Sequence, residues 1–210
     1  MAKKKIVKKV AKKPAKKVAK KAAPKSAKKR VTKAPAKKKA KAFVTLNTKP
    51  SKINVVGDSW VIENPRFGEE GMHYHALGML TPYFKGLTEG KLMGTLCTNP
   101  KCPITHGQGT VWLPPRPDCP DCHAPMKWKE IKDPKGYIYT YSVVERGGTG
   151  LEIETPYYQI DVRLDGVETI VKSYLINREP INIGDKVRAR FLTGKKATNT
   201  CLDLYFELVK

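Results

Sequence analysis

Residues 97–128 read "CTNPKCPITHGQGTVWLPPRPDCPDCHAPMKW", and this stretch decides the fold of the chain. Cys97 and Cys102 form one close pair, C-x4-C, and Cys119 and Cys122 form a second, C-x2-C, after sixteen intervening residues. Two close cysteine pairs separated by roughly 12 to 20 residues are typical of a tetrahedral metal site, because each pair occupies a tight turn and the chain between them folds back. The pattern therefore predicts a zinc ribbon over residues 97–132.

Four thiolates suit Zn²⁺, and a closed shell of four leaves no position for a substrate. We therefore expect a structural ion, whose binding supplies on the order of 10 kcal/mol of folding free energy. Thiolate-bound iron and a site in which His106 or His123 replaces one cysteine are the alternatives. Residues 119–123 also spell C-x-x-C-H, the attachment motif of c-type haem. The second cysteine pair and the cytoplasmic setting inferred below argue against haem.

The positive charge of the chain is concentrated at its N-terminus. The 210 residues carry a formal charge of +22, but residues 1–42 hold 20 Lys or Arg and no Asp or Glu. The remaining residues have 21 basic groups against 19 acidic ones, so they are nearly neutral. A segment of Lys, Ala, Pro and Val with so few large apolar groups is expected to be disordered. Such a tail would contact nucleic acid or acidic surfaces weakly and without specificity.

The compartment follows from what the N-terminus and the cysteines indicate. The sequence shows neither the apolar core of a secretory signal nor a membrane-spanning run of about 18 apolar residues. Clustered cysteines without an export signal are typical of the reducing cytoplasm, where they bind metal more often than they form disulfides. We therefore expect a cytoplasmic protein with no membrane contact. Cys201, outside the cluster, is expected to be a small buried apolar residue.

The segment before the ribbon combines an extended part and a helical part. We expect residues 43–71 to form an extended linker and residues 72–96 a helical lead-in. A short helix is predicted around His75–Leu80, followed by a second helix with Thr81 as its N-cap and Pro82 in its first turn. Gly90 marks the end of that helix.

After the ribbon the period of the apolar residues changes to two, which predicts β-strands. Asp165–Gly166 between two such runs is a strong hairpin signal. Five short antiparallel strands over residues 133–210 suit a small closed barrel of the OB type, so the fold class is mainly β. Tyr137, Tyr139 and Tyr141 are expected on one face of the first strand. The five predicted strands are "GYIYTYSVV", "YYQIDVRLDG", "VETIVKSYLI", "DKVRARFL" and "LDLYFELV".

The order of these parts resembles the DUF35 family, in which a rubredoxin-like zinc ribbon precedes an OB fold. The likeness covers residues 72–209 and rests on "EGKLMGTLC", "LPPRPDCPDC", "GYIYTYSVV", "PYYQIDVRLDG" and "IGDKVRARF". The C-x4-C pair departs from the C-x2-C usual in the family. The resemblance implies a non-catalytic accessory subunit that docks on a thiolase-like enzyme and helps to shape its CoA and acyl-binding site. A narrower likeness is to the small subunits of benzoylsuccinyl-CoA-type thiolases of toluene and benzylsuccinate degradation.

The residues themselves agree that the chain has no activity alone. They show no paired Cys/His nucleophile, and "GGTG" at 147–150 lacks the Lys-Ser/Thr of a phosphate-binding loop. The alternative function is nucleic-acid binding, because zinc ribbons and OB folds both occur in that role and the tail is cationic. The residues expected to form the partner interface are Tyr83, Phe84, Leu87, Trp112 and Trp128.

Overall fold

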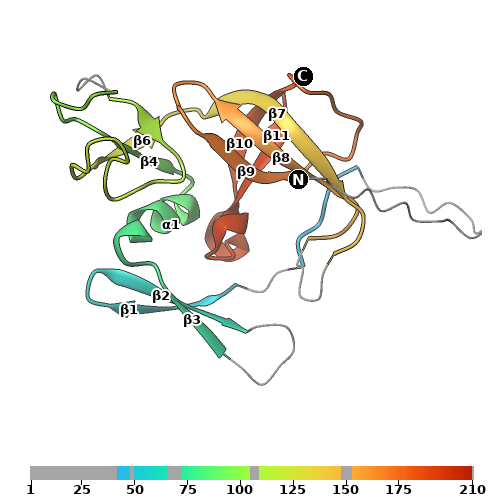
Figure 1. Cartoon of the computed structure of the whole chain (residues 1–210). Helices are drawn as coiled ribbons and strands as arrows, with labels where there is room; N and C mark the ends of the chain where they lie inside the picture. Colours follow the sequence, from blue (N-terminus) through green and yellow to red (C-terminus); the bar gives the residue numbers. More distant parts are fainter. Residues whose placement is uncertain (1–41, 48–49, 66–71, 105–108, 148–152, 210) are drawn as a thin grey trace, which may run out of the picture. The chain divides into compact units, whose positions relative to one another are not determined.

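The computed structural model describes residues 42–47, 50–65, 72–104, 109–147 and 153–209. Within these residues the chain is mainly β, with three sheets and one α-helix (Figure 1). The expected disordered tail, apart from Ala42, and the candidate ligand His106 lie outside the described residues. No helix in the described part of the chain is long and apolar enough to cross a membrane.

The first sheet lies in the segment expected to be an extended linker. Strands β1 (Lys52–Val56), β2 (Ser59–Pro65) and β3 (Met72–Ala76) pair antiparallel in the order β1-β2-β3. The turn from β1 to β2 is made by two residues, the first of which, Gly57, has φ of +59°. The observed hairpin corrects the expectation of a linker over 43–71. A Gly-Asp turn between two apolar runs is a sequence signal for such a hairpin.

The helical lead-in is shorter than expected. A 3-10 turn, η1 (Gly78–Leu80), leads into α1 (Thr81–Thr88). The helix predicted around His75–Leu80 is therefore limited to the three residues of η1, because the chain up to Ala76 belongs to β3. Gly90, with φ of +78°, follows the end of α1 as predicted.

Thr81 has a different role from the one predicted. The N-cap of α1 is Leu80, and Thr81 is the first helical residue. The Thr81 hydroxyl donates to the carbonyl of Gly78 at 2.7 Å and accepts from the amide of Trp60 at 3.1 Å. It therefore fastens the helix to β2 instead of capping the helix.

The third sheet is the expected five-stranded barrel, closed in the order β10-β11-β9-β8-β7. All neighbours are antiparallel except β9 and β11, which meet in parallel at Leu175 and Phe206. The Asp165–Gly166 hairpin turn joins β8 to β9, with φ of +72° at Gly166. The strands are β7 (Lys135–Val144), β8 (Tyr157–Leu164), β9 (Ile170–Leu175), β10 (Lys186–Phe191) and β11 (Leu204–Leu208).

A β-bulge in β7 changes the expected face of its tyrosines. Ile138 pairs with Val162 and Thr140 pairs with Asp161, so Tyr139 is an extra residue in the register. One extra residue moves every following side chain to the opposite face. Tyr137 and Tyr141 therefore lie on different faces, and the prediction of a single tyrosine face is wrong.

One core joins the helix, the ribbon and the barrel. Leu87 of α1 and Leu113 of the ribbon are fully buried with the inward side chains of the barrel. Burying a large aliphatic side chain contributes about 1.5–3 kcal/mol, so this shared core fixes the ribbon against the barrel. Its buried members include Leu92, Ile138, Ile160, Val162, Val187 and Phe206.

Residues 42–46 lie along the outside of the barrel. The amide of Val44 donates to the carbonyl of Ile176, and the amide of Glu154 donates to the carbonyl of Thr45, both at 2.9 Å. These bonds hold the segment over a second, smaller apolar cluster. Its buried members are Val44, Ile153, Tyr157 and Tyr174.

The loop before β11 ties the first sheet to the barrel. The Asp203 carboxylate is fully buried and accepts the amides of Thr198 at 2.5 Å and Asn199 at 2.8 Å. The loop in turn holds Ser51, whose amide donates to the Thr198 carbonyl at 2.9 Å and whose carbonyl accepts from Asn199 Nδ2 at 2.8 Å. Asp203 therefore organises the contact that anchors β1.

Candidate metal centre

The cysteines lie at one end of a three-stranded sheet with the order β5-β4-β6. Its strands are β4 (Leu92–Leu96), β5 (Val111–Trp112) and β6 (Lys127–Ile131). Cys97 directly follows β4, and Cys122 lies five residues before β6. Because β4 and β6 are antiparallel, the end of one strand and the start of the other meet at the same edge of the sheet.

The structure brings all four predicted cysteines together. Their four Sγ atoms all lie within 4.8 Å of one another; the cysteines are Cys97, Cys102, Cys119 and Cys122. The first three side chains are buried and Cys122 is half-buried. The wider spacing of the first pair therefore does not separate Cys97 from the other sulfurs.

Each cysteine pair occupies a tight turn. In the first, the amide of Cys102 donates to the carbonyl of Asn99 at 3.0 Å. In the second, the amide of Cys119 donates to the Ala124 carbonyl and the amide of His123 donates to the Cys119 carbonyl, both at 2.9 Å. His123 has φ of +57°, a left-handed conformation that closes the second turn. His123 is exposed and does not belong to the sulfur cluster.

The sulfur spacing fits a tetrahedral ion. Cys97 and Cys122 have their Sγ atoms 3.7 Å apart, and those of Cys102 and Cys119 are 4.0 Å apart. Zinc–sulfur bonds of about 2.3 Å in a tetrahedron place neighbouring sulfurs about 3.8 Å apart. A disulfide would need about 2.05 Å, so these cysteines form no disulfide with one another and their sulfurs are arranged as ligands. Cys119 and Cys122 are paired with the other two cysteines, which is the arrangement of a thiolate cluster and not of covalently attached haem.

Burial of the Cys119 thiol favours its protonated form when no ion is bound. It raises the pKa of the Cys119 thiol to about 11, so that this group is protonated at neutral pH when no ion is bound. A cation that accepts four thiolates would release such protons on binding and hold the two turns together. The group can therefore hold a metal ion, and its all-sulfur donor set suits a soft or borderline ion.

The residues predicted for the partner interface fall into two groups. Leu87 is fully buried and Tyr83 is 8% exposed, both in the shared core, and Phe84 packs against that core. These side chains face the interior because α1 packs through them against the barrel and β4. The prediction that Tyr83 and Leu87 are available to a partner is therefore corrected. Trp128 is 37% exposed, and Trp112 is half-buried.

The two tryptophans lie on the same face of the ribbon sheet. Thr95 of β4 pairs with Trp112 on one side and with Trp128 on the other. The Arg116 guanidinium lies 5.6 Å from the centroid of the Trp112 ring, and the Arg116 amide donates to the Thr95 hydroxyl at 2.9 Å. We call Trp112, Trp128, Thr95 and Arg116 the tryptophan face.

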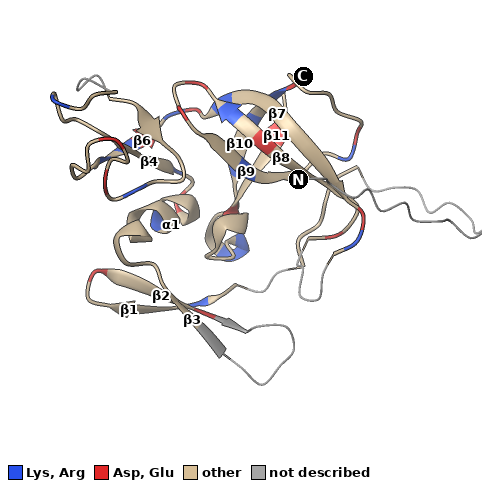
Figure 2. Ribbon diagram, viewed as in Figure 1, with Lys and Arg blue, Asp and Glu red and all other residues tan. Residues whose placement is uncertain are grey.

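One further observation differs from the expectations. Cys201 is exposed in the 3-10 turn η3 (Cys201–Asp203), so it is not the buried apolar residue expected. Acidic and basic residues are interspersed along the ribbon of the described elements (Figure 2).

A sulfur-cluster ribbon joined to an OB-like barrel defines a recognisable class, and comparison with known proteins agrees. Residues 128–192 match the family of the C-terminal OB-fold domain of ChsH2. A "DUF35 domain-containing scaffold protein" of Methanocaldococcus jannaschii is 34% identical over 102 residues, which are 48% of this chain and 67% of the relative. The chain belongs to the DUF35 family.

Two solved structures are similar to this chain over part of its length. A DUF35 protein of unknown function from Sulfolobus solfataricus is 21% identical, with a TM-score of 0.45, and the match covers 63% of this chain and 87% of that one. The "Ltp2-ChsH2(DUF35) aldolase" is 24% identical, with a TM-score of 0.47, and the match covers 60% of this chain and 91% of that one.

Proposed function

We propose that this chain is a non-catalytic accessory subunit of a thiolase-like acyl-CoA enzyme in the cytoplasm. In this role it docks on the catalytic subunit and helps to shape the site that binds CoA and the acyl group. The observation that carries the proposal is the family membership, together with a relative described as a scaffold protein. The metal centre fits a scaffold, because four sulfurs leave no open position on an ion for a substrate.

We propose that the ion is Zn²⁺ and that Cys97, Cys102, Cys119 and Cys122 are its ligands. Zinc has no redox chemistry and accepts a tetrahedral set of four thiolates. The ion would connect the ends of β4 and β6, and these strands carry the tryptophan face. A bound ion therefore stiffens the surface that we assign to docking.

Of the predicted interface, Trp128 is exposed and Trp112 is half-buried, and both belong to the tryptophan face. Tryptophan and arginine are enriched among the residues that contribute most to binding at protein interfaces. Trp128 is exposed, while Thr95 and Arg116 fix the surface on which it lies. We propose that this face contacts the catalytic subunit, in place of the buried Tyr83 and Leu87.

Co-purification from the native lysate tests both proposals. The tagged full-length chain should capture a thiolase-like enzyme, identified by mass spectrometry, and Trp128→Ala should weaken that capture by about tenfold or more. Tyr139→Ala is the matched control, because Tyr139 is an aromatic residue even more exposed than Trp128 (50% against 37%), on the barrel strand β7 and outside the tryptophan face. Absence of any thiolase-like enzyme contradicts the function, whereas equal capture by the two variants contradicts only the docking face.

For the substrate we propose an aromatic acyl-CoA of the kind formed in toluene and benzylsuccinate degradation. The support is the resemblance to benzoylsuccinyl-CoA-type thiolase subunits. The captured complex should cleave an aromatic 3-oxoacyl-CoA with free CoA faster than an aliphatic one of similar length. A preference for the aliphatic thioester contradicts the assignment of the substrate.

A further inference from the structure

The outer face of β10 carries a row of cations. Lys186, Arg188 and Arg190 alternate along the strand with Val187 and Ala189, which are buried in the barrel core. Because side chains of a strand alternate between its two faces, the three cations all lie on the outside of the barrel. Lys135 of the neighbouring strand β7 pairs with Arg188, which extends the row sideways.

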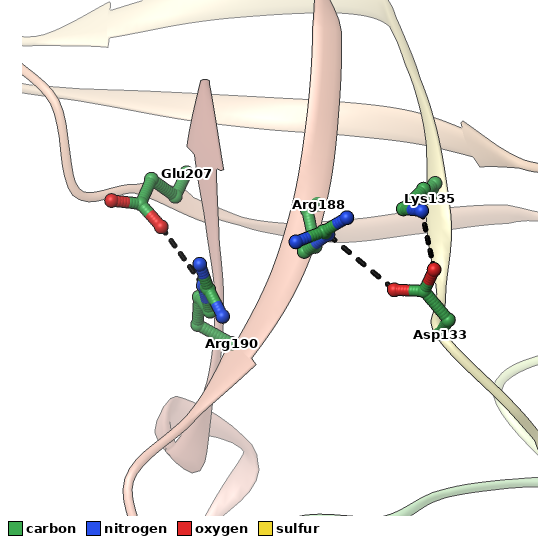
Figure 3. Close-up of polar contacts among 5 residues, drawn as sticks. All are labelled: Asp133, Lys135, Arg188, Arg190 and Glu207. Atoms are coloured by element: carbon green, nitrogen blue, oxygen red, sulfur yellow. Dashed lines mark hydrogen bonds and ion pairs between the residues drawn. The ribbon is translucent and has the colours of Figure 1, made fainter. Parts of the chain in front are cut away.

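Two carboxylates neutralise this row only in part (Figure 3). Arg190 donates from Nε to Glu207 at 2.8 Å. Asp133 forms ion pairs with both Lys135 and Arg188, and its contact with Arg188 Nε is 3.4 Å long. The Arg188 Nε atom is buried and makes no hydrogen bond within the described residues. Arg188, Arg190 and Lys135 thus share two carboxylates, and the ion pair of Arg188 uses its Nε atom.

A hollow of about 370 Å³ opens beside these side chains. Arg188, Arg190 and Glu207 line it together with Asn177, and Phe43 and Val209 give it an apolar wall. Phe43 is 55% exposed although its backbone is fixed, because it forms a β-bridge with Asn177 and precedes the buried Val44. The volume falls in the range of small-molecule sites, about 300–1,000 Å³, and a hollow of this kind differs from the flatter surface of a protein interface.

We propose that this hollow binds a nucleotide, with its phosphate on Arg188 and Arg190 and its base against Phe43. Arginine presents a fork of donors that matches phosphate, and charge-assisted bonds of this kind are the strong ones. A simple anion would leave the apolar wall uncovered, whereas a nucleotide also offers a flat ring that can stack on an aromatic side chain. The proposal goes beyond the accessory function, since neither the metal centre nor the tryptophan face takes part in it.

A substitution of Glu207 can distinguish nucleotide binding from a purely structural role of these charged residues. Its carboxylate occupies Arg190 and adds a negative charge to the hollow, so a phosphate has to compete with it. Glu207→Gln removes that charge and leaves Arg190 available. The variant should bind more tightly than the natural protein, although it loses an ion pair.

The ligand has two possible sources, a free nucleotide or one nucleotide of a single strand. The probes are therefore 5′-AMP, inorganic phosphate and a labelled strand of ten thymidines, titrated at physiological salt. All variants are made in the full-length chain, so that the 20 basic residues among the first 42 contribute equally to each measurement. The double variant Arg188→Gln/Arg190→Gln should weaken binding by about tenfold, and Glu207→Gln should strengthen it by about threefold.

Lys172→Gln is the matched control, because Lys172 is an exposed cation on β9 with one carboxylate partner, Asp161 at 3.9 Å, and does not line the hollow. It should change the affinity by less than about twofold. Phe43→Ala should weaken the binding of 5′-AMP and leave that of phosphate unchanged.

The results of these titrations distinguish a free nucleotide from a single strand. Arginine-dependent binding of 5′-AMP assigns a free nucleotide, and arginine-dependent binding of the strand alone assigns a single strand. The inference is overturned if the double variant binds like the Lys172 control, or if Glu207→Gln does not bind more tightly. Equal affinity for phosphate and 5′-AMP, with no effect of Phe43→Ala, also overturns it, because the base would then make no contact.

Discussion

Replacing Asp203 by alanine should test how the first sheet is held to the barrel. Its carboxylate accepts the amides of Thr198 and Asn199 at 2.5 and 2.8 Å and has no exposed surface. Each buried amide that loses its acceptor costs about 1–3 kcal/mol, so the two together cost about 2–6 kcal/mol. Burial raises the pKa of Asp203 despite these bonds, which means that the charged group is itself strained by desolvation. Removing that charge offsets part of the loss, and we expect a net loss of about 2–4 kcal/mol.

Denaturant unfolding of the metal-bound protein at neutral pH measures this loss. Asp165→Ala is the matched control, because Asp165 lies exposed in the β8–β9 turn, and it should change the stability by less than about 0.5 kcal/mol. Hydrogen exchange should in addition show faster exchange at Ser51, whose amide donates to Thr198. A loss below about 1 kcal/mol for Asp203→Ala, or unchanged exchange at Ser51, refutes the anchoring role.

Three other outcomes are expected. Removal of the ion with a chelator should release one zinc per chain and destabilise the ribbon by on the order of 10 kcal/mol, seen as a large drop in the thermal midpoint; release of another metal, or of none, contradicts the zinc assignment. Gly136→Ala should cost about 2 kcal/mol or more in urea unfolding, because the new Cβ would overlap the backbone carbonyl of Arg163 in the closed barrel. The hydrogen bond with Lys135 and the charge of Arg188 lower the pKa of Asp133 in the folded protein, so its stabilising contribution is present above its unfolded pKa of about 3.9 and is lost as the pH falls below it. Asp133→Asn should accordingly remove a part of the acid sensitivity of unfolding, and identical pH profiles of the two proteins would show that this carboxylate does not contribute.

The metal centre and the barrel could be predicted because their signals are local. Two cysteine pairs specify two turns, and a strand reveals itself by alternating apolar residues, as in "YYQIDVRLDG". The bulge at Tyr139 has no such signal, because "GYIYTYSVV" alternates without a break and the extra residue is visible only in the pairing with β8. The first sheet could not be predicted for another reason: in "KINVVGDSWVIENP" the apolar residues fall in adjacent groups such as Trp60, Val61 and Ile62, which hides the period of two.

Side chains whose roles depend on tertiary contacts could not be predicted from the sequence either. Tyr83 and Leu87 form an apolar stripe on α1, and such a stripe fits a partner as well as it fits the chain's own core. Only the position of the helix against the barrel decides between them. The hollow at Phe43 joins residues from three distant parts of the chain, Phe43, Asn177 and the pair Arg188 and Arg190, which no spacing rule brings together.

The segment from Ala42 to Leu46 decides where the chain can be cut. The amide of Arg178 donates to the carbonyl of Ala42 at 3.2 Å, and Val44 closes the cluster that contains Tyr157 and Tyr174. A shortened version that starts after Leu46 would leave two aromatic rings facing water and would invite aggregation for reasons unrelated to the lysines. A truncation meant to isolate the effect of the basic tail should therefore begin no later than Ala42.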